Sequence, residues 1–521
     1  MKDDPAPRPG NPSTQDSSVS PSAPVEIPPE PRERIAELIK QSGVYGIGAL
    51  ATQLAGFFLL PILARVLTQA QYGVVFLAEM LGLLLFVFSE LGLTSAFFRF
   101  YPEEREAAGR RTLVYTVFNL LVAFSALVTA ACVAFSGPLS TLVFGGRAWQ
   151  YAFVVVCLTN FLTVASRMPL DLLRMDKRAG VFVFISVVRL VSTFMVSLYL
   201  VVRAGRGAIG VLEGALAGTA IGLALLSPVV LKYWRPRIDR QVALRALRFG
   251  AFLIPGGLAV WALNQSDRYL LRTFGELAMV AAYGVGFKFA SVLNVFLVTP
   301  FLTAWTPFMF RVSGQADARR LYARVLTYFV LVSTWALVAL SATIVDITRV
   351  IAGPAYANAG LLVPFIGFGF ALYGVASVVV VGVYLRERTF HVSVAMTLGA
   401  LVKIGLSIPA IPRMGAMGVA LSTAVAFAVV VLYLVLVLRR LFPLPYELVR
   451  MTKILAAGGM TLAGLLAVPL GGVGGAGVKA AGSLVFFVLV WLLGVPQPDE
   501  KQKLRDTVGR AARRLRRSPG P

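Results

Sequence analysis

Three cationic side chains stand inside long apolar stretches of this chain, where a charge needs either a function or a partner. Arg189 lies within VFVFISVVRLVSTFMVSLYL, and Lys288 and Lys403 lie near the middle of two other apolar runs. A cation at the centre of a bilayer costs at least about 2.5–3.5 kcal/mol, so it is kept only beside water or an acid. Arginine binds phosphate through a two-pronged fork, and lysine acts as a mobile point charge. The three residues predict a site for an anionic ligand, unless each pairs with a buried carboxylate and only fixes helices.

Four further charged residues are candidates for a gate or for coupling to an ion. Asp267 and Arg268 are adjacent near one end of an apolar run, which indicates a gate or a structural ion pair. Arg65 ends the first run, where it could contribute to a gate or extend its charged head to the interface. Glu90 could exchange a proton, hold a cation or pair with a neighbouring basic residue. A single histidine and two cysteines inside apolar runs give no metal site, and no cofactor is expected.

The composition explains why these charges stand out. The chain has 521 residues, of which 57% are hydrophobic and only 14% charged, whereas soluble domains carry about 25% charged residues. A run of roughly 20 apolar residues is long enough to cross a bilayer. Such runs predict fourteen transmembrane helices in an all-α integral membrane protein, at 41–66, 74–98, 112–135, 149–171, 181–202, 208–231, 249–271, 277–310, 321–344, 357–384, 390–410, 415–438, 447–470 and 476–495.

The basic residues predict the orientation of these helices. With the N-terminus in the cytoplasm, the cytoplasmic segments carry 34 Lys and Arg near the helix ends, and the opposite side carries 8. This is the bias of the positive-inside rule, so both termini are predicted to be cytoplasmic, and the net charge of +24 indicates membrane topology rather than nucleic-acid binding. The proline-rich residues 1–34 predict a disordered tail. Residues 496–521 form a basic amphipathic tail, either bound to anionic lipids or simply solvated.

A repeated pattern indicates that two halves of the chain have the same architecture. One copy runs from Gly43 to Tyr72-Gly73, and the other from Gly250 to Tyr283-Gly284; the copies begin 207 residues apart. Each precedes an even number of predicted helices, so the halves are parallel repeats about an axis along the membrane normal. The predicted domains are a six-helix bundle at 35–231, a basic cytoplasmic linker at 232–248, a second six-helix bundle at 249–440 and two extra helices at 441–495.

The stretches ARVLTQAQYG and ALRALRFGAFLIPGGLAVWALNQSDRYLLRTFGELAMVAAYGVGFKFA resemble bacterial polysaccharide-biosynthesis membrane proteins. These are Wzx-type O-antigen flippases of the multidrug/oligosaccharidyl-lipid/polysaccharide exporter superfamily. In that family the pair at Asp267 and Arg268, the lysine at Lys288 and the arginine at Arg65 recur. Ala281 stands where a glycine is common, a departure that leaves the predicted fold unchanged.

The resemblance implies a V-shaped pair of bundles that moves an undecaprenyl-diphosphate-linked oligosaccharide across the bacterial inner membrane by alternating access. The cargo would be a repeat unit of O-antigen or exopolysaccharide, and H⁺ or Na⁺ would be a coupling ion. A polysaccharide polymerase and chain-length machinery are expected partners. Because a diphosphate is anionic, the cationic residues Arg189, Lys288 and Lys403 would line the central passage.

Four other kinds of function remain as alternatives. A peptidoglycan-precursor flippase would share the helix number and the internal cations. A multidrug antiporter would have twelve helices and a cavity rich in carboxylates. A membrane-embedded glycan polymerase or transferase needs clustered acids on a sizeable external loop, and the short loops predicted here argue against such an enzyme. A purely structural scaffold leaves the internal cations unexplained.

Overall fold

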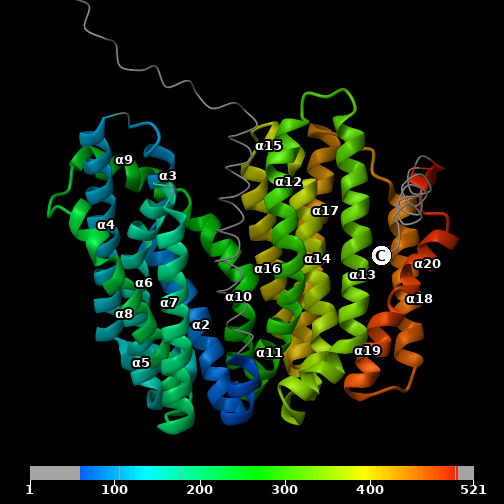
Figure 1. Ribbon diagram of the computed structural model, residues 1–521, viewed down its shortest axis with the longest axis horizontal. Helices are drawn as coiled ribbons and strands as arrows, with labels where there is room; N and C mark the ends of the chain where they lie inside the picture. Colours follow the sequence, from blue (N-terminus) through cyan, green and yellow to red (C-terminus); the bar gives the residue numbers. More distant parts are fainter. Residues whose placement is uncertain (1–58, 105, 177, 499, 503–521) are drawn as a thin grey trace, which may run out of the picture.

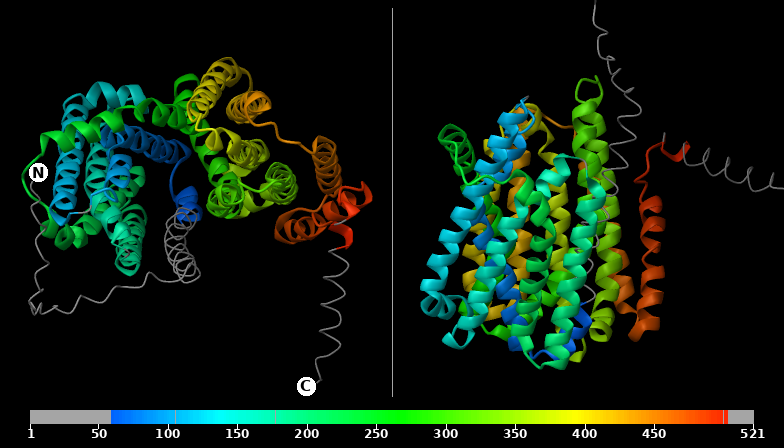
Figure 2. Two further views of the ribbon diagram at one scale, coloured as in Figure 1. Left: turned by 90° about the horizontal axis from the view of Figure 1, so that it is seen from above. Right: turned by 60° about the vertical axis from the view of Figure 1, so that its left-hand side comes forward.

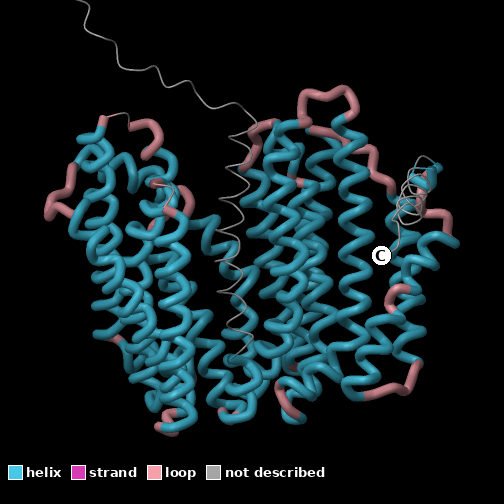
Figure 3. Tube along the Cα trace, viewed as in Figure 1, coloured by secondary structure: helices cyan, strands magenta, loops and turns pink. Residues whose placement is uncertain are grey.

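The computed structural model describes residues 59–104, 106–176, 178–498 and 500–502, and in these ranges every regular element is a helix. Figure 3 shows long helices joined by short loops. The described part of the chain contains 12 helices that are long and apolar enough to span a membrane, or 13 when the bent pair α9 and α10 is taken as one span. The protein is therefore a multi-pass membrane protein. The first predicted span, 41–66, lies largely outside the described residues, so the total of fourteen stays a prediction.

The helices that follow the short helical segment 59–66 form what we call the N-terminal bundle (Figure 1). Its members are α2 (Gln69–Glu90), α3 (Leu93–Phe100), α4 (Ala107–Ala134), α5 (Ser136–Phe144), η1 (Arg147–Trp149), α6 (Gln150–Met175), α7 (Ala179–Leu198), η2 (Tyr199–Arg203) and α8 (Gly207–Tyr233).

A linker helix and a second bundle follow. The linker helix is α9 (Arg240–Ala251), which packs against α3 and α4 of the N-terminal bundle. The C-terminal bundle comprises α10 (Ile254–Phe274), α11 (Leu277–Leu293), η3 (Asn294–Val298), α12 (Thr299–Arg311), α13 (Ala318–Ile351), η4 (Pro354–Leu362), α14 (Val363–Val379), α15 (Val381–Leu385), α16 (Phe390–Met414) and α17 (Ala416–Leu441).

Three more helices end the described chain: α18 (Leu448–Ala467), α19 (Gly472–Gly482) and α20 (Val485–Leu492). In Figures 1 and 2 they lie at the periphery beside α13, and α18 and α19 pack directly on that helix. One ion pair joins this group to the bundle, and another lies at the start of α18. Lys479 lies 3.4 Å from Asp346 of α13, and Arg450 lies 2.7 Å from Glu447.

Local sequence sets where several helices begin and break. Thr68 and Gln71 form a reciprocal capping box that starts α2, because each side chain accepts a hydrogen bond from the backbone N–H of the other residue. The same helix ends where Leu91 and Gly92 both adopt left-handed backbone angles, with φ of 49° and 68°. Pro255 falls in the first turn of α10, where its missing N–H breaks no helical hydrogen bond, and α9 meets α10 there at a 40° bend.

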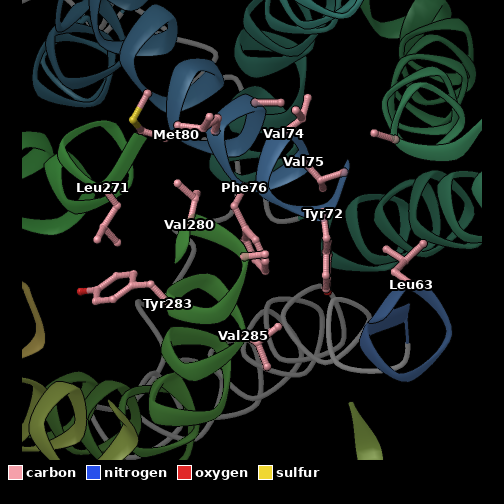
Figure 4. Close-up of a cluster of buried hydrophobic side chains, with 14 of the residues drawn as sticks. Leu63, Tyr72, Val74, Val75, Phe76, Met80, Leu271, Val280, Tyr283 and Val285 are labelled. Atoms are coloured by element: carbon pink, nitrogen blue, oxygen red, sulfur yellow. The ribbon is translucent and has the colours of Figure 1, made fainter. Parts of the chain in front are cut away.

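The hydrophobic cores show how the two bundles are joined. One core contains Tyr72 and Phe76 of the N-terminal bundle together with Val280 and Tyr283 of the C-terminal bundle (Figure 4). Phe144 belongs to the same core. This core occupies the lower end in Figure 1, where α5 ends and α11 begins. The cores nearer the opposite end are separate: one combines α3, α4 and α6 with α9, and another lies within the C-terminal bundle and the helices beside it. The bundles thus share their mixed core at one end, and towards the other end they meet along α2 and α10, where an added Cβ at Gly257 would lie 3.5 Å from Val87. The charge count predicts that the end with the mixed core faces outside, and we call it the outer end.

The repeated Tyr-Gly motif lies at the crossing of the two bundles. A Cβ atom added to Gly73 of α2 would come 2.3 Å from the carbonyl oxygen of Leu277 in α11. One added to Gly284 of α11 would come 2.4 Å from the ring of Phe76 in α2. The glycine of each copy therefore lets its own helix approach the other bundle closely. The tyrosines of both copies are fully buried in the shared core.

Candidate functional site

Lys403 and Asp267 form a fully buried ion pair inside the C-terminal bundle. The Lys403 Nζ atom of α16 donates to Asp267 Oδ2 of α10 at 3.2 Å and to the carbonyl oxygen of Leu263 at 2.7 Å. The two side chains are 1% and 0% exposed. A buried charge is tolerated when an opposite charge and hydrogen bonds replace its lost hydration. The pair therefore satisfies Lys403 without any ligand.

Arg268 adds a second cation to this cluster. Its Nη1 atom lies 4.0 Å from Asp267 Oδ1 and donates to the side-chain oxygen of Gln265. Its guanidinium also lies 4.7 Å from the centre of the Phe287 ring, a favourable position over an aromatic face. Asp267 is thus one buried carboxylate between two buried cations, and the cluster carries a formal charge of +1.

Lys288 and Glu79 form a second ion pair, and this one joins the two bundles. Lys288 Nζ of α11 donates to Glu79 Oε1 of α2 at 3.1 Å and lies 5.1 Å from the centre of the Phe76 ring. The side chains are 20% and 45% exposed, although both residues lie well inside their helices. Exposed charges at mid-helix would be costly in hydrocarbon, so this pair is a candidate for a water-filled passage between the bundles.

Arg189 lies in the other bundle and has no acidic partner in the described part of the chain. Its Nη2 atom on α7 makes one long hydrogen bond, 3.4 Å, to Thr163 Oγ1 of α6. On the α8 side it packs against Gly222, where an added Cβ would lie 3.3 Å from the Arg189 stem. A guanidinium has five N–H donors, so most of those on Arg189 are left for water or a ligand.

The two remaining predicted residues stand apart from these clusters. Arg65 lies at the outer end, where its Nη2 atom donates to the backbone carbonyl of Val350 at 2.7 Å. This contact joins the bundles, as a gate residue would. Glu90 is the last residue of α2 and is half-buried, and its side chain makes no hydrogen bond or ion pair within the described ranges. Its coupling role stays a prediction.

The structure corrects the predicted picture of three cations that face one passage. Lys403 is buried with its own acid, because Asp267 and Leu263 fill the space around its ammonium group. Lys288 is balanced by Glu79, and its side chain stays 20% exposed. Only Arg189 has no carboxylate within ion-pair distance among the described residues. The alternative that the sequence left open, a cation paired with an acid, therefore describes two of the three.

Glu79 is the site residue that sequence reasoning missed as a partner. It lies 209 positions from Lys288, and no local periodicity connects residues so far apart. A usable signal is that both residues follow a copy of the Tyr-Gly motif within two helical turns. Because the two copies meet at the bundle crossing, residues just beyond them face the same seam.

Solved structures with the same fold are membrane transporters. The chain aligns with the lipid II flippase MurJ in an inward closed conformation at a TM-score of 0.71 and 15% identity, over 89% of this chain and 99% of that one. An inward-facing multidrug resistance MATE family transporter of the MOP superfamily aligns at a TM-score of 0.59 and 13% identity, over 82% and 96%. The MATE transporter VcmN of Vibrio cholerae aligns at 0.52 and 13%, over 78% and 98%.

The sequence itself identifies the family. Residues 62–360, more than half of the chain, match the family described as Polysaccharide biosynthesis protein, and the chain belongs to that family. A search of curated proteins found no match. The resemblance predicted from the sequence is confirmed at the level of family and fold.

Proposed function

We propose that this protein is a flippase that moves a lipid-linked oligosaccharide from the cytoplasmic to the outer leaflet of the bacterial inner membrane. The carrier lipid would be undecaprenyl diphosphate, and no covalent bond would be made or broken. The observation that carries the proposal is the Lys288–Glu79 pair, which is charged, partly exposed and placed where the two bundles meet. Membership of the polysaccharide biosynthesis family supports a glycan cargo.

The chemistry of the cargo fits the available cations. A diphosphate is an anion that can compete with Glu79 for the ammonium group of Lys288. Arg189 offers unused N–H donors that suit phosphate or an acidic sugar. The polar headgroup would cross through water between the bundles while the prenyl tail stays in lipid. Lys403, buried with Asp267 in this conformation, would reach cargo only if α10 and α16 moved apart, and this pair is therefore a candidate for coupling to H⁺ or Na⁺.

The arrangement of the cores supports a cytoplasm-facing resting state. The bundles share one core at the outer end and have separate cores towards the end that the charge count predicts to be cytoplasmic. Cargo would enter from the cytoplasmic side, and separation of the outer end would then release it. The family likeness and this geometry both favour alternating access by rocking of two bundles.

The test is a flipping assay with the full chain reconstituted in vesicles that contain an undecaprenyl-diphosphate-linked oligosaccharide. The measured quantity is the rate at which the glycan becomes accessible to a membrane-impermeant oxidant. Replacing Lys288 with Gln should slow flipping by about 10- to 100-fold, the value of one hydrogen bond between charged groups. Glu79→Gln should instead tighten headgroup binding, because the competing carboxylate is gone.

Lys232→Gln is the matched control, because Lys232 is an exposed lysine at the end of α8. It should flip at the rate of the unmodified protein. A normal rate for Lys288→Gln would overturn the proposed role of the pair, and no flipping of any glycan by the unmodified protein would overturn the function itself.

A peptidoglycan lipid precursor is the second candidate cargo. The alignment with MurJ extends over 89% of this chain, beyond the coverage of the two MATE transporters described above, so that the fold likeness includes more of the chain. The same vesicles loaded with lipid II in place of the oligosaccharide discriminate between the two, because the preferred cargo will be flipped faster at equal concentration.

A further inference from the structure

Two arginines at the outer end make the same contact in opposite directions across the bundle interface. Arg65 of the N-terminal half donates from Nη2 to the carbonyl oxygen of Val350 in α13 at 2.7 Å. Arg272 of α10 donates from Nε to the carbonyl oxygen of Phe144 in α5 at 3.0 Å. Each bond therefore runs from the arginine of one half to a backbone acceptor of the other.

The spacing of the four residues shows that the two contacts are copies. Arg272 follows Arg65 by 207 residues, and Val350 follows Phe144 by 206. The repeat predicted from sequence has an offset of 207 residues. Two-fold repeats place equivalent residues in equivalent positions, so donor and acceptor have been duplicated together.

Both acceptors are carbonyls at helix ends, where the backbone lacks its own donors. Phe144 is the last residue of α5, and Val350 is the penultimate residue of α13. The last four carbonyls of a helix have no partner within it, and the C-terminal end of the helix carries a partial negative charge. Each arginine therefore stabilises the C-terminus of a helix that belongs to the other bundle.

A glycine with positive φ follows each acceptor helix, and the one after Phe144 makes room for its arginine. Gly145 directly follows α5 with φ of 85°, and Gly353 follows α13 with φ of 91°. These angles strain any residue with a side chain. An added Cβ at Gly145 would also fall 1.1 Å from Arg272 Nη2. The guanidinium thus occupies the space that a side chain would fill.

We propose that Arg65 and Arg272 form a duplicated clasp that holds the outer ends of the bundles together, and that both bonds must break before the outer end opens. The clasp rests on the proposed function for its purpose, because opening of this end is the release step. Its acceptors are backbone carbonyls and guanidinium groups stay protonated at all relevant pH values, so its strength does not vary with pH.

The test measures the width of the outer end directly in the full chain. Spin labels are placed at Ala148 and Asn358, which are exposed at the outer end of the two bundles, after both native cysteines are replaced by alanine. Electron–electron distances in nanodiscs then give the fraction of molecules with a long separation. Arg65→Gln and Arg272→Gln should each raise that fraction by about fivefold, and the double variant by roughly the product.

Lysine variants and an outer-end control keep the result interpretable. Arg65→Lys and Arg272→Lys keep the charge at the helix end and should produce smaller shifts than the Gln variants. Arg349→Gln removes an exposed arginine beside Val350 that makes no contact across the interface within the described residues, and it should leave the distances unchanged. An equal shift in this control, or a shift for Arg65→Gln with none for Arg272→Gln, would overturn the duplicated clasp.

The clasp and the proposed function fail in distinguishable ways. Longer distances in the Gln variants would support the clasp even if no glycan is flipped. The absence of flipping would then contradict only the assignment of the cargo. Flipping at the normal rate in the double variant, with a single short distance throughout, would show that the two bonds are not a clasp.

Discussion

The two bundles each place a cation on their fifth predicted helix, and the contrast between these cations is instructive. Lys403 on α16 is fully buried and bound to Asp267, whereas Arg189 on α7 is partly exposed and has no carboxylate partner in the described part of the chain. The helix pairs that carry them are alike, because α7 packs along α8 and α16 packs along α17. The same framework therefore holds one neutralised and one uncompensated charge.

This difference distinguishes two roles of a charge inside a membrane protein, which are to stabilise the fold and to bind a ligand. A charge with its own acid contributes to specificity of packing, and losing either partner is costly. A charge without an acidic partner stabilises the fold less than such an ion pair does, and it is kept for a function. We therefore expect the C-terminal cation to be sensitive in unfolding experiments and the N-terminal cation to be sensitive in transport experiments.

The largest expected effect is on stability, after removal of the acid in the C-terminal bundle. Asp267→Asn leaves Lys403 and Arg268 buried without a counter-charge, and it should cost about 3–5 kcal/mol of unfolding free energy. Lys403→Met should cost less, because Asp267 still faces Arg268. Unfolding in a detergent titration measures both. Equal losses from the two substitutions would contradict the role of Arg268 as a second counter-charge.

The second effect is on transport, after removal of the cation in the N-terminal bundle. Arg189→Gln should slow flipping by about 10- to 100-fold through loss of a charged hydrogen bond to the cargo. Its unfolding free energy should change by less than about 1 kcal/mol, because no buried acid is left unpaired. Arg203→Gln, an exposed arginine at the end of the same helical run, is the control. A matched loss of stability and flipping in Arg189→Gln would remove the contrast between the bundles.

The third effect tests the glycine surface that accommodates Arg189. A Cβ at Gly218 of α8 would lie 2.0 Å from Thr193 Oγ1 and 2.8 Å from the Arg189 carbonyl oxygen. Gly218→Ala should therefore force α7 and α8 apart and cost about 1–3 kcal/mol. Gly405→Ala in α16 meets nothing within 4 Å, and it should be neutral or stabilise that helix by up to about 1 kcal/mol. Thermal unfolding of the two variants distinguishes them, and similar melting would show that the α7–α8 contact is looser than described.

The smallest effect is a pH dependence confined to the C-terminal side. Burial alone would raise the pKa of Glu500, but hydrogen bonds from Tyr328, the Gln497 N–H and Arg450 hold that pKa below its ordinary value of 4.5. A lowered pKa stabilises the fold above the ordinary value, and the contribution is lost as pH falls through the lower folded value. The difference between the melting temperatures at pH 7 and pH 4 should be smaller in Glu500→Gln than in the unmodified protein. An unchanged pH dependence in the variant would contradict this.

Much of the fold could be predicted from local features of the sequence. Apolar run length located the long membrane-spanning helices that the structure describes, because a helix must satisfy its own backbone in lipid over a fixed thickness, but it did not locate the linker helix α9. The Tyr-Gly repeat identified related regions, which meet at Gly73 and Gly284. The partners of the charged residues were not predictable in the same way. Glu79 and Asp267 were visible as acids inside helices, but their pairing with Lys288 and Lys403 depends on contacts between helices more than a hundred residues apart.

The sequence by itself determined that this is a helical membrane protein with charges inside its apolar runs, and it predicted a duplicated plan, because hydropathy and repeats are local properties of the chain. Only the tertiary structure decided which of those charges is neutralised and which bundle ends are joined. Charge compensation and core formation depend on distances in space, and helix packing sets those distances. Arg189 and Lys403 are both cations inside apolar runs of the sequence. They differ because α10 places Asp267 beside Lys403.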